Sequence, residues 1–359
     1  MLLTDIYGEA QVVERLDALL ALGKDRIHVN GMTGSLPAVV AATMLLRHPE
    51  CGQMLIVGNK EEAYYLLNDI ETLLDESDAD MDQKRALLFP SSYRKPRRKS
   101  LATREGVVVS TAADDGGDLF ETDNANVLQR SEVVKQLNAG RNLMVVTYPE
   151  ALVEKVVSSR TLTSKTFTVL RGAQLSMDFV IDVLQDYDFE RVDFVVAPGQ
   201  YAVRGGIIDV FSFANEYPFR IEFFGDEVDS LRTFDPVTQL SIKQYDQIGV
   251  LPNMAHRGPE QVTVEEQVSL LQYFGSTDVV WVQGLMFVSD IIEKHFDLSG
   301  RDAEHFCSAN EFLKSLIRCR IVETGNSSYF TKAEVVNTQS SPQPAFNKQF
   351  DMLMSTLRD

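Results

Sequence analysis

The feature that most constrains the fold is an alternation of two hydrophobic periods along roughly the first 160 residues. Apolar residues recur at helical spacing in three stretches, at 9–22, 37–47 and 59–76. Short apolar runs typical of buried strands lie between and after them, at 26–30, 53–58, 86–90 and 143–149. Strands that alternate with helices form parallel sheets covered on both faces, so this region predicts an α/β domain.

The pattern changes twice further along the chain. After about Ser164, a helical stretch at 176–188 precedes two runs typical of antiparallel hairpins, at 194–213 and 219–235. The α/β rhythm returns from about Val262. We therefore expect a discontinuous α/β domain at 1–165 and 251–340, an inserted α+β domain at 166–250, and a linker at 341–359.

Residues 31–38, GMTGSLPA, begin like a phosphate-binding loop of the form G-x-x-x-x-G-K-[ST]. Gly31 opens the pattern and Gly34 lies inside it. The second glycine, the lysine and the metal-ligating hydroxyl are replaced by Leu36, Pro37 and Ala38. Each change removes a different phosphate or metal contact, and Pro37 suits the first turn of the following helix. We expect a nonfunctional nucleotide loop that does not hydrolyse ATP.

No other pattern indicates catalysis or a metal site. The one lookalike of a Walker B carboxylate in this domain is Asp75 with Glu76, which helical spacing places at a solvated helix end. The three cysteines form no C-x-x-C pair, which suits a reducing compartment, and the five histidines are scattered. We therefore expect no metal and no catalytic residues in this chain.

Charge argues against a protein that wraps nucleic acid. The formal net charge is −18, whereas phosphate binding needs clustered Lys and Arg. A basic cluster at 94–99 is a local exception, inside a weakly periodic surface excursion from Tyr93 to about Asn124. We interpret it as a solvated loop, because no aromatic platform is interleaved beyond Tyr93. No signal peptide or membrane-spanning run is visible, so we expect a soluble, cytoplasmic protein.

The segment FRIEFFGDEV at 219–228 alternates strictly between two faces of a strand. One set of residues can face the core: Phe219, Ile221 and Phe223. The other set then lies on the outer face: Arg220, Glu222 and Phe224. An aromatic beside arginines is a common composition of protein–protein hot spots, and the alternative is a phenylalanine covered by a neighbouring strand.

A second arginine precedes this strand. A hairpin turn at 213–218 brings the run containing Arg204 beside Arg220, and the Gly205–Gly206 pair invites a bulge that directs Arg204 to the same face. We expect Ala at Arg204, Arg220 or Phe224 to change stability little, as at ordinary surface sites. Arg232 should serve as a near-neutral control.

The run from Gly199 to Ser241, with LMVVTYPEALVEKV at 143–156, resembles the UvrB-homology module of bacterial transcription-repair coupling factors and, more distantly, UvrB. The likeness covers most of the chain and is strongest from about Asn142 to Pro252. UvrB has an intact ATP-binding loop, whereas the coupling factors have lost it. The replacements at 36–38 therefore favour the coupling factors.

The resemblance implies a degenerate P-loop, helicase-like domain with an inserted UvrB-type domain that recruits UvrA of nucleotide excision repair. The family's UvrA-binding residues match at Arg204, Arg220 and Phe224. It also implies that RNA polymerase and DNA bind to domains beyond these residues, which use ATP and magnesium as a DNA translocase. This chain would then be an N-terminal adaptor fragment with no cofactor. Two alternatives stay open: a UvrB-type damage-loading ATPase, and a nucleic-acid-binding module using the 94–99 cluster.

Overall fold

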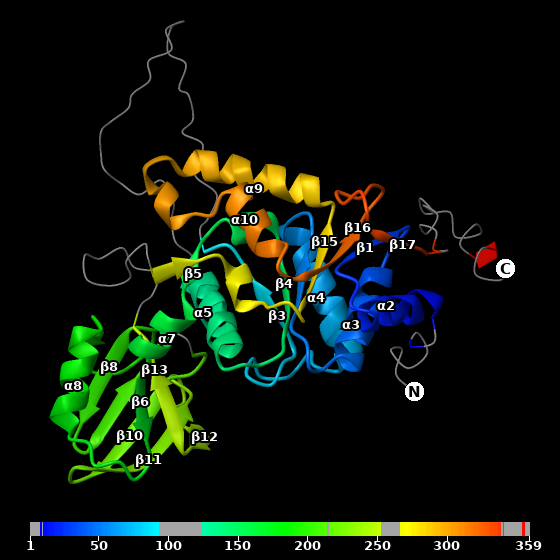
Figure 1. The fold of residues 1–359 in the computed structure, drawn as a ribbon. Helices are drawn as coiled ribbons and strands as arrows, with labels where there is room; N and C mark the ends of the chain where they lie inside the picture. The colour runs from blue at the N-terminus through cyan, green and yellow to red at the C-terminus, as the bar shows by residue number, and fades with distance from the viewer. Residues whose placement is uncertain are drawn as a thin grey trace, which may run out of the picture.

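The structure is a computed structural model of the chain. It describes residues 8, 10–92, 124–213, 215–252, 266–338, 340 and 354–355, and the basic cluster at 94–99 lies outside these ranges, as does nearly all of the excursion around it. The described residues fold around two main sheets, each with its own hydrophobic core (Figure 1). None of the helices in these ranges combines the length and the apolar character needed to cross a lipid bilayer.

The larger sheet contains seven parallel strands among the described residues, in the order β17, β1, β16, β15, β2, β4, β3. Their bounds are β1 Arg26–Asn30, β2 Gln53–Ile56, β3 Ala86–Phe89, β4 Met144–Thr147, β15 Val279–Gln283, β16 Arg320–Thr324 and β17 Glu334–Asn337. Because β15 and β16 lie between β1 and β2, one sheet joins the two separated parts of the chain. The predicted parallel, discontinuous α/β fold is confirmed.

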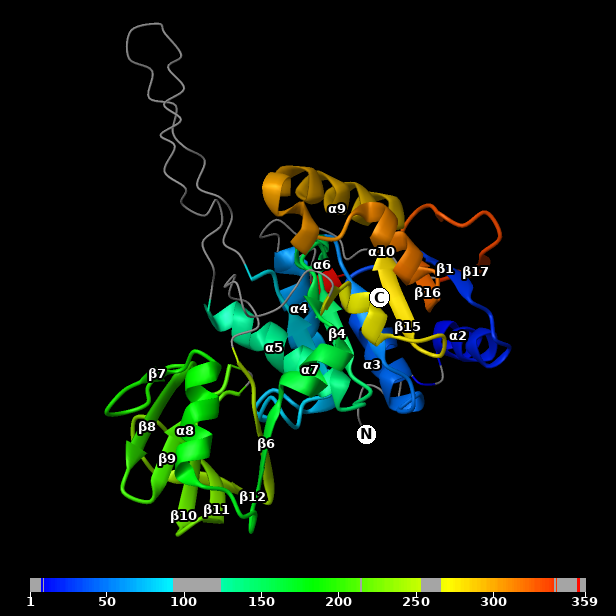
Figure 2. The same cartoon turned by 60° about the vertical axis from the view of Figure 1, so that its left-hand side comes forward.

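Helices cover both faces of this sheet. They are α2 Gln11–Ala21, α3 Leu36–Arg47, α4 Lys60–Leu74, α5 Asn124–Asn138, α6 Pro149–Leu152, α7 Ser159–Lys165, α9 Leu285–Ser299 and α10 Ala309–Leu316, with 3-10 turns η2 Leu270–Tyr273 and η3 Gly300–His305. Figures 1 and 2 show α9 with α10 on one side and α2 with α3 on the other. All five residues predicted for the apolar face of α2 are buried: Val12, Val13, Leu16, Leu19 and Leu20.

The inserted α+β region forms a six-stranded sheet in the order β12, β11, β10, β9, β8, β7. Its strands are β7 Glu190–Arg191, β8 Gln200–Arg204, β9 Ile207–Val210, β10 Phe219–Phe224, β11 Glu227–Phe234 and β12 Ser241–Tyr245. A short ladder of β6 Phe167–Leu170 with β13 Gln247–Val250 shares the core of this unit, whereas the ladder of β5 Val156–Val157 with β14 Gln267–Val268 packs against the core of the larger sheet.

Helix α8, Met177–Asp186, packs against one face of the six-stranded sheet. Its buried residues Val180 and Leu184 share a core with Tyr201, Phe219 and Ile221 of the strands. The opposite face carries polar side chains beside a small buried cluster of Val195, Ala202 and Phe211. The functional surface described below lies there.

Candidate functional site

The loop after β1 is contacted by the side chains of Thr338 and Ser340, which follow β17. Gly31 and Gly34 have φ angles of 83° and 60°, a conformation that favours glycine. A Cβ on Gly31 would lie 2.9 Å from Oγ1 of Thr338. The hydroxyl of Ser340 donates to the carbonyl oxygen of Gly31, and Thr33 Oγ1 donates to Ser340 Oγ at 3.2 Å. The carbonyl oxygen of Gly31 and the hydroxyl of Thr33 are therefore already engaged within the chain.

The three replaced positions of the loop form the start of α3, and two of them pack into the core. Helix α3 begins at Leu36, and Pro37 lies in its first turn, as predicted. Leu36 packs against the main core, and Ala38 is fully buried within it. None of these side chains is a cation or a hydroxyl, so the loop does not fit a nucleoside triphosphate with its magnesium.

A carboxylate able to reach a metal at this loop would have to lie near the carboxyl end of a strand next to β1. Strand β16 is such a neighbour, and it carries Glu323 beside His28 of β1. Glu323 is 1% exposed, and its Oε1 and Oε2 accept hydrogen bonds from the backbone N–H groups of Leu285 at 3.1 Å and Tyr329 at 2.7 Å. It thus anchors the start of α9 and the segment after β16.

Sequence reasoning missed Glu323, because a single glutamate in a strand has no motif context. It considered Asp75 with Glu76 as a Walker B lookalike and placed both at a solvated helix end, and there the structure requires a correction. Asp75 is exposed at the C-terminal end of α4, but Glu76 is buried and forms an ion pair with Arg85. A solvated helix end is therefore the correct interpretation for Asp75 only.

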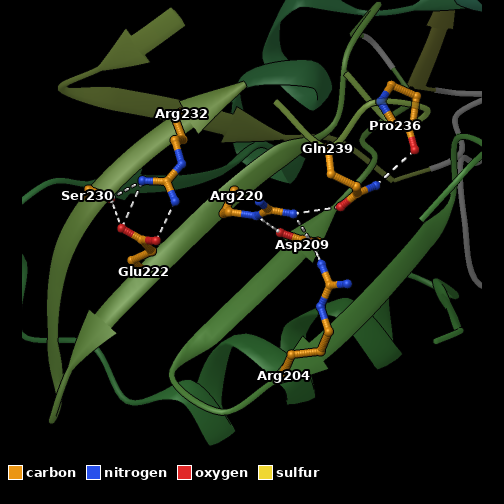
Figure 3. A network of polar contacts seen from close by, with 8 residues as sticks. All are labelled: Arg204, Asp209, Arg220, Glu222, Ser230, Arg232, Pro236 and Gln239. Carbon is orange, nitrogen blue, oxygen red and sulfur yellow. Dashed lines mark hydrogen bonds and ion pairs between the residues drawn. The ribbon is translucent and has the colours of Figure 1, made fainter. Parts of the chain in front are cut away.

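The outer face of the six-stranded sheet carries a connected polar network, drawn in Figure 3. The strand register places Asp209 of β9 opposite Arg220 of β10, and Arg220 opposite Arg232 of β11. Arg204 lies at the end of β8, before the turn into β9. The predicted hairpin between β9 and β10 is confirmed, and it brings Arg204 and Arg220, the two arginines predicted to bind UvrA, onto one face.

The Gly205–Gly206 pair forms a two-residue hairpin turn between β8 and β9. The bulge expected there is wrong: Arg204 pairs directly with Ile207, and Gly205 takes the turn with a φ of 59°. Arg204 reaches the outer face through the ordinary alternation of β8.

Asp209 is the centre of the network and is 1% exposed. Arg220 donates from Nε to Oδ1 at 2.7 Å and from Nη2 to Oδ2 at 2.9 Å. Arg204 forms an ion pair with the same Oδ2. One buried carboxylate is therefore shared by two guanidinium groups, which leaves the trio with two positive charges and one negative charge.

Arg220 is enclosed on several sides. Its side chain is 12% exposed, its Nη2 also donates to Gln239 Oε1 at 2.9 Å, and its guanidinium carbon lies 4.2 Å from the ring centroid of Phe234. The hydrogen bonds to Asp209 raise the pKa of Arg220. The expectation that Arg220 is an ordinary surface site is wrong, because its removal would leave Asp209 buried with one fewer partner.

Arg232 is likewise not a free surface residue. Its Nη1 donates to Glu222 Oε2 at 2.9 Å, and its Nη2 pairs with Oε1 of the same carboxylate. These bonds, with one at 2.6 Å from Ser230 Oγ, lower the pKa of Glu222. With 20% of its side chain exposed, Arg232 is unsuitable as the neutral control that the sequence suggested.

Phe224 and Arg204 remain accessible. Phe224 is 84% exposed at the end of β10, where Gly225, with a φ of 64°, begins the hairpin turn into β11. The side chain of Arg204 is 36% exposed, and its guanidinium carbon lies 5.0 Å from the ring centroid of Phe194. The two hairpin turns lie side by side, since the backbone N–H of Phe223 donates to Gly206 O at 2.8 Å. The predicted alternation holds: Phe219 and Ile221 are buried, and Phe224 is outside.

This α+β unit is inserted into a parallel-sheet domain and presents an arginine and an exposed aromatic, and its residues 167–256 match the family described as the UvrB interaction domain. The chain is homologous to transcription-repair coupling factors and to UvrABC system protein B. The coupling factor of Escherichia coli is 30% identical over 142 residues, or 40% of this chain and 12% of that protein.

Two further relatives extend the comparison. The coupling factor of Bacillus subtilis is 34% identical over 124 residues, or 34% of this chain and 10% of that protein. UvrABC system protein B of Corynebacterium diphtheriae is 24% identical over 254 residues, or 70% of this chain and 34% of that protein. The alignments thus span about a tenth of each coupling factor and about a third of the UvrB relative.

Proposed function

We propose that this chain is the N-terminal adaptor module of a transcription-repair coupling factor, and that its inserted domain recruits UvrA to RNA polymerase stalled at DNA damage. The observation that carries the proposal is that Phe224 is 84% exposed. Arg204 is also accessible, and both residues lie in the segment that matches the UvrB interaction domain. A large exposed aromatic on a rigid sheet is the kind of residue that dominates protein–protein binding energy.

Charge supports a partner surface with an acidic part. Arg204 and Arg220 share the single carboxylate of Asp209, so this part of the face is positive although the chain as a whole is acidic. Complementary potentials fix the register of a complex and speed its formation. The network is also held by buried contacts, which lowers the ordering cost of binding.

The proposal assigns RNA polymerase binding, DNA binding and ATP-driven translocation to domains beyond these residues. For the chain itself it assigns no ATPase activity, supported by the packing roles of Leu36 and Ala38 and by the engagement of Glu323 with backbone amides. A UvrB-type ATPase is the second candidate, favoured by the 254-residue alignment with UvrABC system protein B. The third, DNA binding through 94–99, is tested by salt-dependent titration with duplex DNA.

A titration of UvrA against wild type and four single variants tests the adaptor function. Phe224→Ala should weaken binding by at least about 2 kcal/mol, or roughly thirtyfold, as expected for a hot-spot aromatic. Arg204→Ala should weaken it by a similar factor if its partner carboxylate is desolvated in the complex.

The controls match these residue types on other parts of the same unit. Phe179 of α8 is 51% exposed, and the side chain of Arg171 is 58% exposed. Phe179→Ala and Arg171→Ala should bind UvrA within about twofold of wild type, and thermal melts verify that all four variants fold. Normal binding by both Phe224→Ala and Arg204→Ala would overturn the proposed function.

A further inference from the structure

The turn between β11 and β12, residues 235–240, is a rigid element. Asp235 Oδ1 accepts hydrogen bonds from the backbone N–H groups of Val237 at 2.8 Å and Thr238 at 2.7 Å. The backbone N–H of Gln239 donates to Asp235 O at 2.8 Å, and that of Asp235 donates to Leu240 O at 2.9 Å. These bonds define a closed turn whose conformation does not depend on a partner.

Gln239 joins this turn to the polar network. Its φ of 61° is uncommon for a residue other than glycine and needs support from its surroundings. Its Oε1 accepts from Arg220 Nη2 at 2.9 Å, and its Nε2 donates to Pro236 O at 2.8 Å. Figure 3 shows the resulting line of contacts from Arg204 through Asp209, Arg220 and Gln239 to Pro236.

The same turn exposes two apolar side chains. Val237 is 89% exposed and Leu240 is 69% exposed. Single exposed apolar residues are ordinary. Here, however, two lie on one closed turn that is hydrogen-bonded, through Gln239, to Arg220 of the polar network.

We infer that the 235–240 turn is a second contact element for UvrA, and that Arg220 is a positioning residue that holds this turn instead of touching the partner. The inference rests on the proposed function. Arg220 is 12% exposed, its Nε and Nη2 are used by Asp209 and Gln239, and Phe234 lies against its guanidinium. Little of the Arg220 side chain is therefore accessible to a partner, whereas the side chains of Val237 and Leu240 are exposed to solvent.

The dimensions allow one partner to cover both elements. Strand β10 has six residues, Phe219–Phe224, which at about 3.3 Å per residue extend roughly 20 Å. A standard interface buries about 800 Å² on each partner, a patch wider than that distance. Phe224 at one end of β10 and the turn near its other end therefore fit within one footprint.

The first test replaces the exposed apolar pair. Val237→Ser/Leu240→Ser should weaken UvrA binding at least tenfold with an unchanged melting temperature, because both side chains are outside the core. The matched control is Leu170→Ser on β6, where the side chain is 50% exposed, and it should bind within twofold of wild type. If the double variant binds UvrA with full affinity while Phe224→Ala loses binding, this inference is wrong but the proposed function is still supported. If Phe224→Ala and Arg204→Ala also bound normally, the proposed function would fail as well.

The second test separates positioning from contact. Gln239→Gly keeps a residue that accepts a positive φ but removes both side-chain hydrogen bonds. It should weaken UvrA binding about fivefold and speed hydrogen exchange of the Val237 and Thr238 amides about tenfold. In the Val237→Ser/Leu240→Ser background, the same change should cost less than twofold, because the contacts it positions are gone. Unchanged exchange rates, or a full fivefold loss in that background, would contradict the positioning role.

A second copy of this chain is the competing occupant of the turn. Sedimentation of the free chain at micromolar concentration addresses it, and a monomer is expected for wild type and for Val237→Ser/Leu240→Ser alike. A wild-type dimer that the double variant abolishes would show that the turn is a self-association surface and would overturn the inference.

Discussion

Asp209 and Arg220 face each other across adjacent strands β9 and β10. Arg220 donates two hydrogen bonds to the buried carboxylate, from Nε to Oδ1 at 2.7 Å and from Nη2 to Oδ2 at 2.9 Å. A residue that the family resemblance marks for binding is thus also part of the structural pairing of its own sheet. Loss of binding on its removal does not by itself identify a contact, so stability and binding must be measured together.

Arg220→Ala should destabilise the fold. The change leaves Asp209, 1% exposed, with Arg204 as its remaining ion-pair partner among the described residues. Breaking a buried pair costs about 3–5 kcal/mol when the remaining charge is uncompensated, and the pairing with Arg204 should reduce this to about 2 kcal/mol. Urea unfolding measures the loss in the free energy of unfolding. The control is Arg171→Ala, which breaks an exposed ion pair with Asp246 and should stay within about 0.5 kcal/mol of wild type.

A compensating variant makes the prediction sharper. Arg220→Met/Asp209→Leu removes both charges, and apolar replacement of a buried ion pair is often neutral or stabilising. The double variant should therefore be more stable than Arg220→Ala. If it is equally unstable, the cost at Arg220 comes from its packing on Phe234, with the ring centroid 4.2 Å away, and the buried carboxylate is not the cause.

Glu222 gives the outer face an acid-sensitive component. Its pKa is lowered by Arg232 first and by Ser230 next. A carboxyl group with a depressed pKa in the folded state stabilises the protein above its unfolded pKa of about 4.3, and this contribution is lost as the pH falls through the folded value. Glu222→Gln should therefore lower the melting temperature at pH 7, and the difference from wild type should shrink as the pH falls below about 4.3. A constant difference across this range would contradict the assignment.

The sequence predicted local patterns well and long-range contacts poorly. The strand β10 alternation and the apolar face of α2 follow from spacing alone, and both are confirmed. The burial of Asp209 was missed, because it depends on the register that places Arg220 opposite it. The contact of Ser340 with Gly31 joins residues 309 positions apart, a separation that no local period encodes. Strand β17 was missed for the same reason, since its partner β1 lies at the other end of the chain.

Glu323 should be important for stability without any catalytic role. Its carboxylate, 1% exposed, accepts bonds from two backbone N–H groups and from Ser328 Oγ at 3.0 Å. Glu323→Ala leaves these donors unpaired beside a new cavity, so a loss of about 2–4 kcal/mol is expected by urea unfolding. Glu334→Ala is the control, because its side chain is 40% exposed and its pair with Lys24 is at the surface. Equal effects of the two changes would contradict the anchoring role of Glu323.

The wild-type loop at 31–38 should bind ATP with a dissociation constant above about 1 mM. Rebuilding the motif should not create an ATPase. Leu36→Gly/Pro37→Lys/Ala38→Thr restores the full pattern G-x-x-x-x-G-K-T in the sequence. The loop would still be bonded to Ser340 and crowded by Thr338, and Glu323 would still be committed to the start of α9. The measurements are calorimetry with ATP and magnesium and a phosphate-release assay, with thermal melts to confirm that the triple variant folds. Micromolar ATP binding by the wild-type chain, or turnover by the folded triple variant, would show that the loop has kept a nucleotide site and would favour the UvrB-type ATPase.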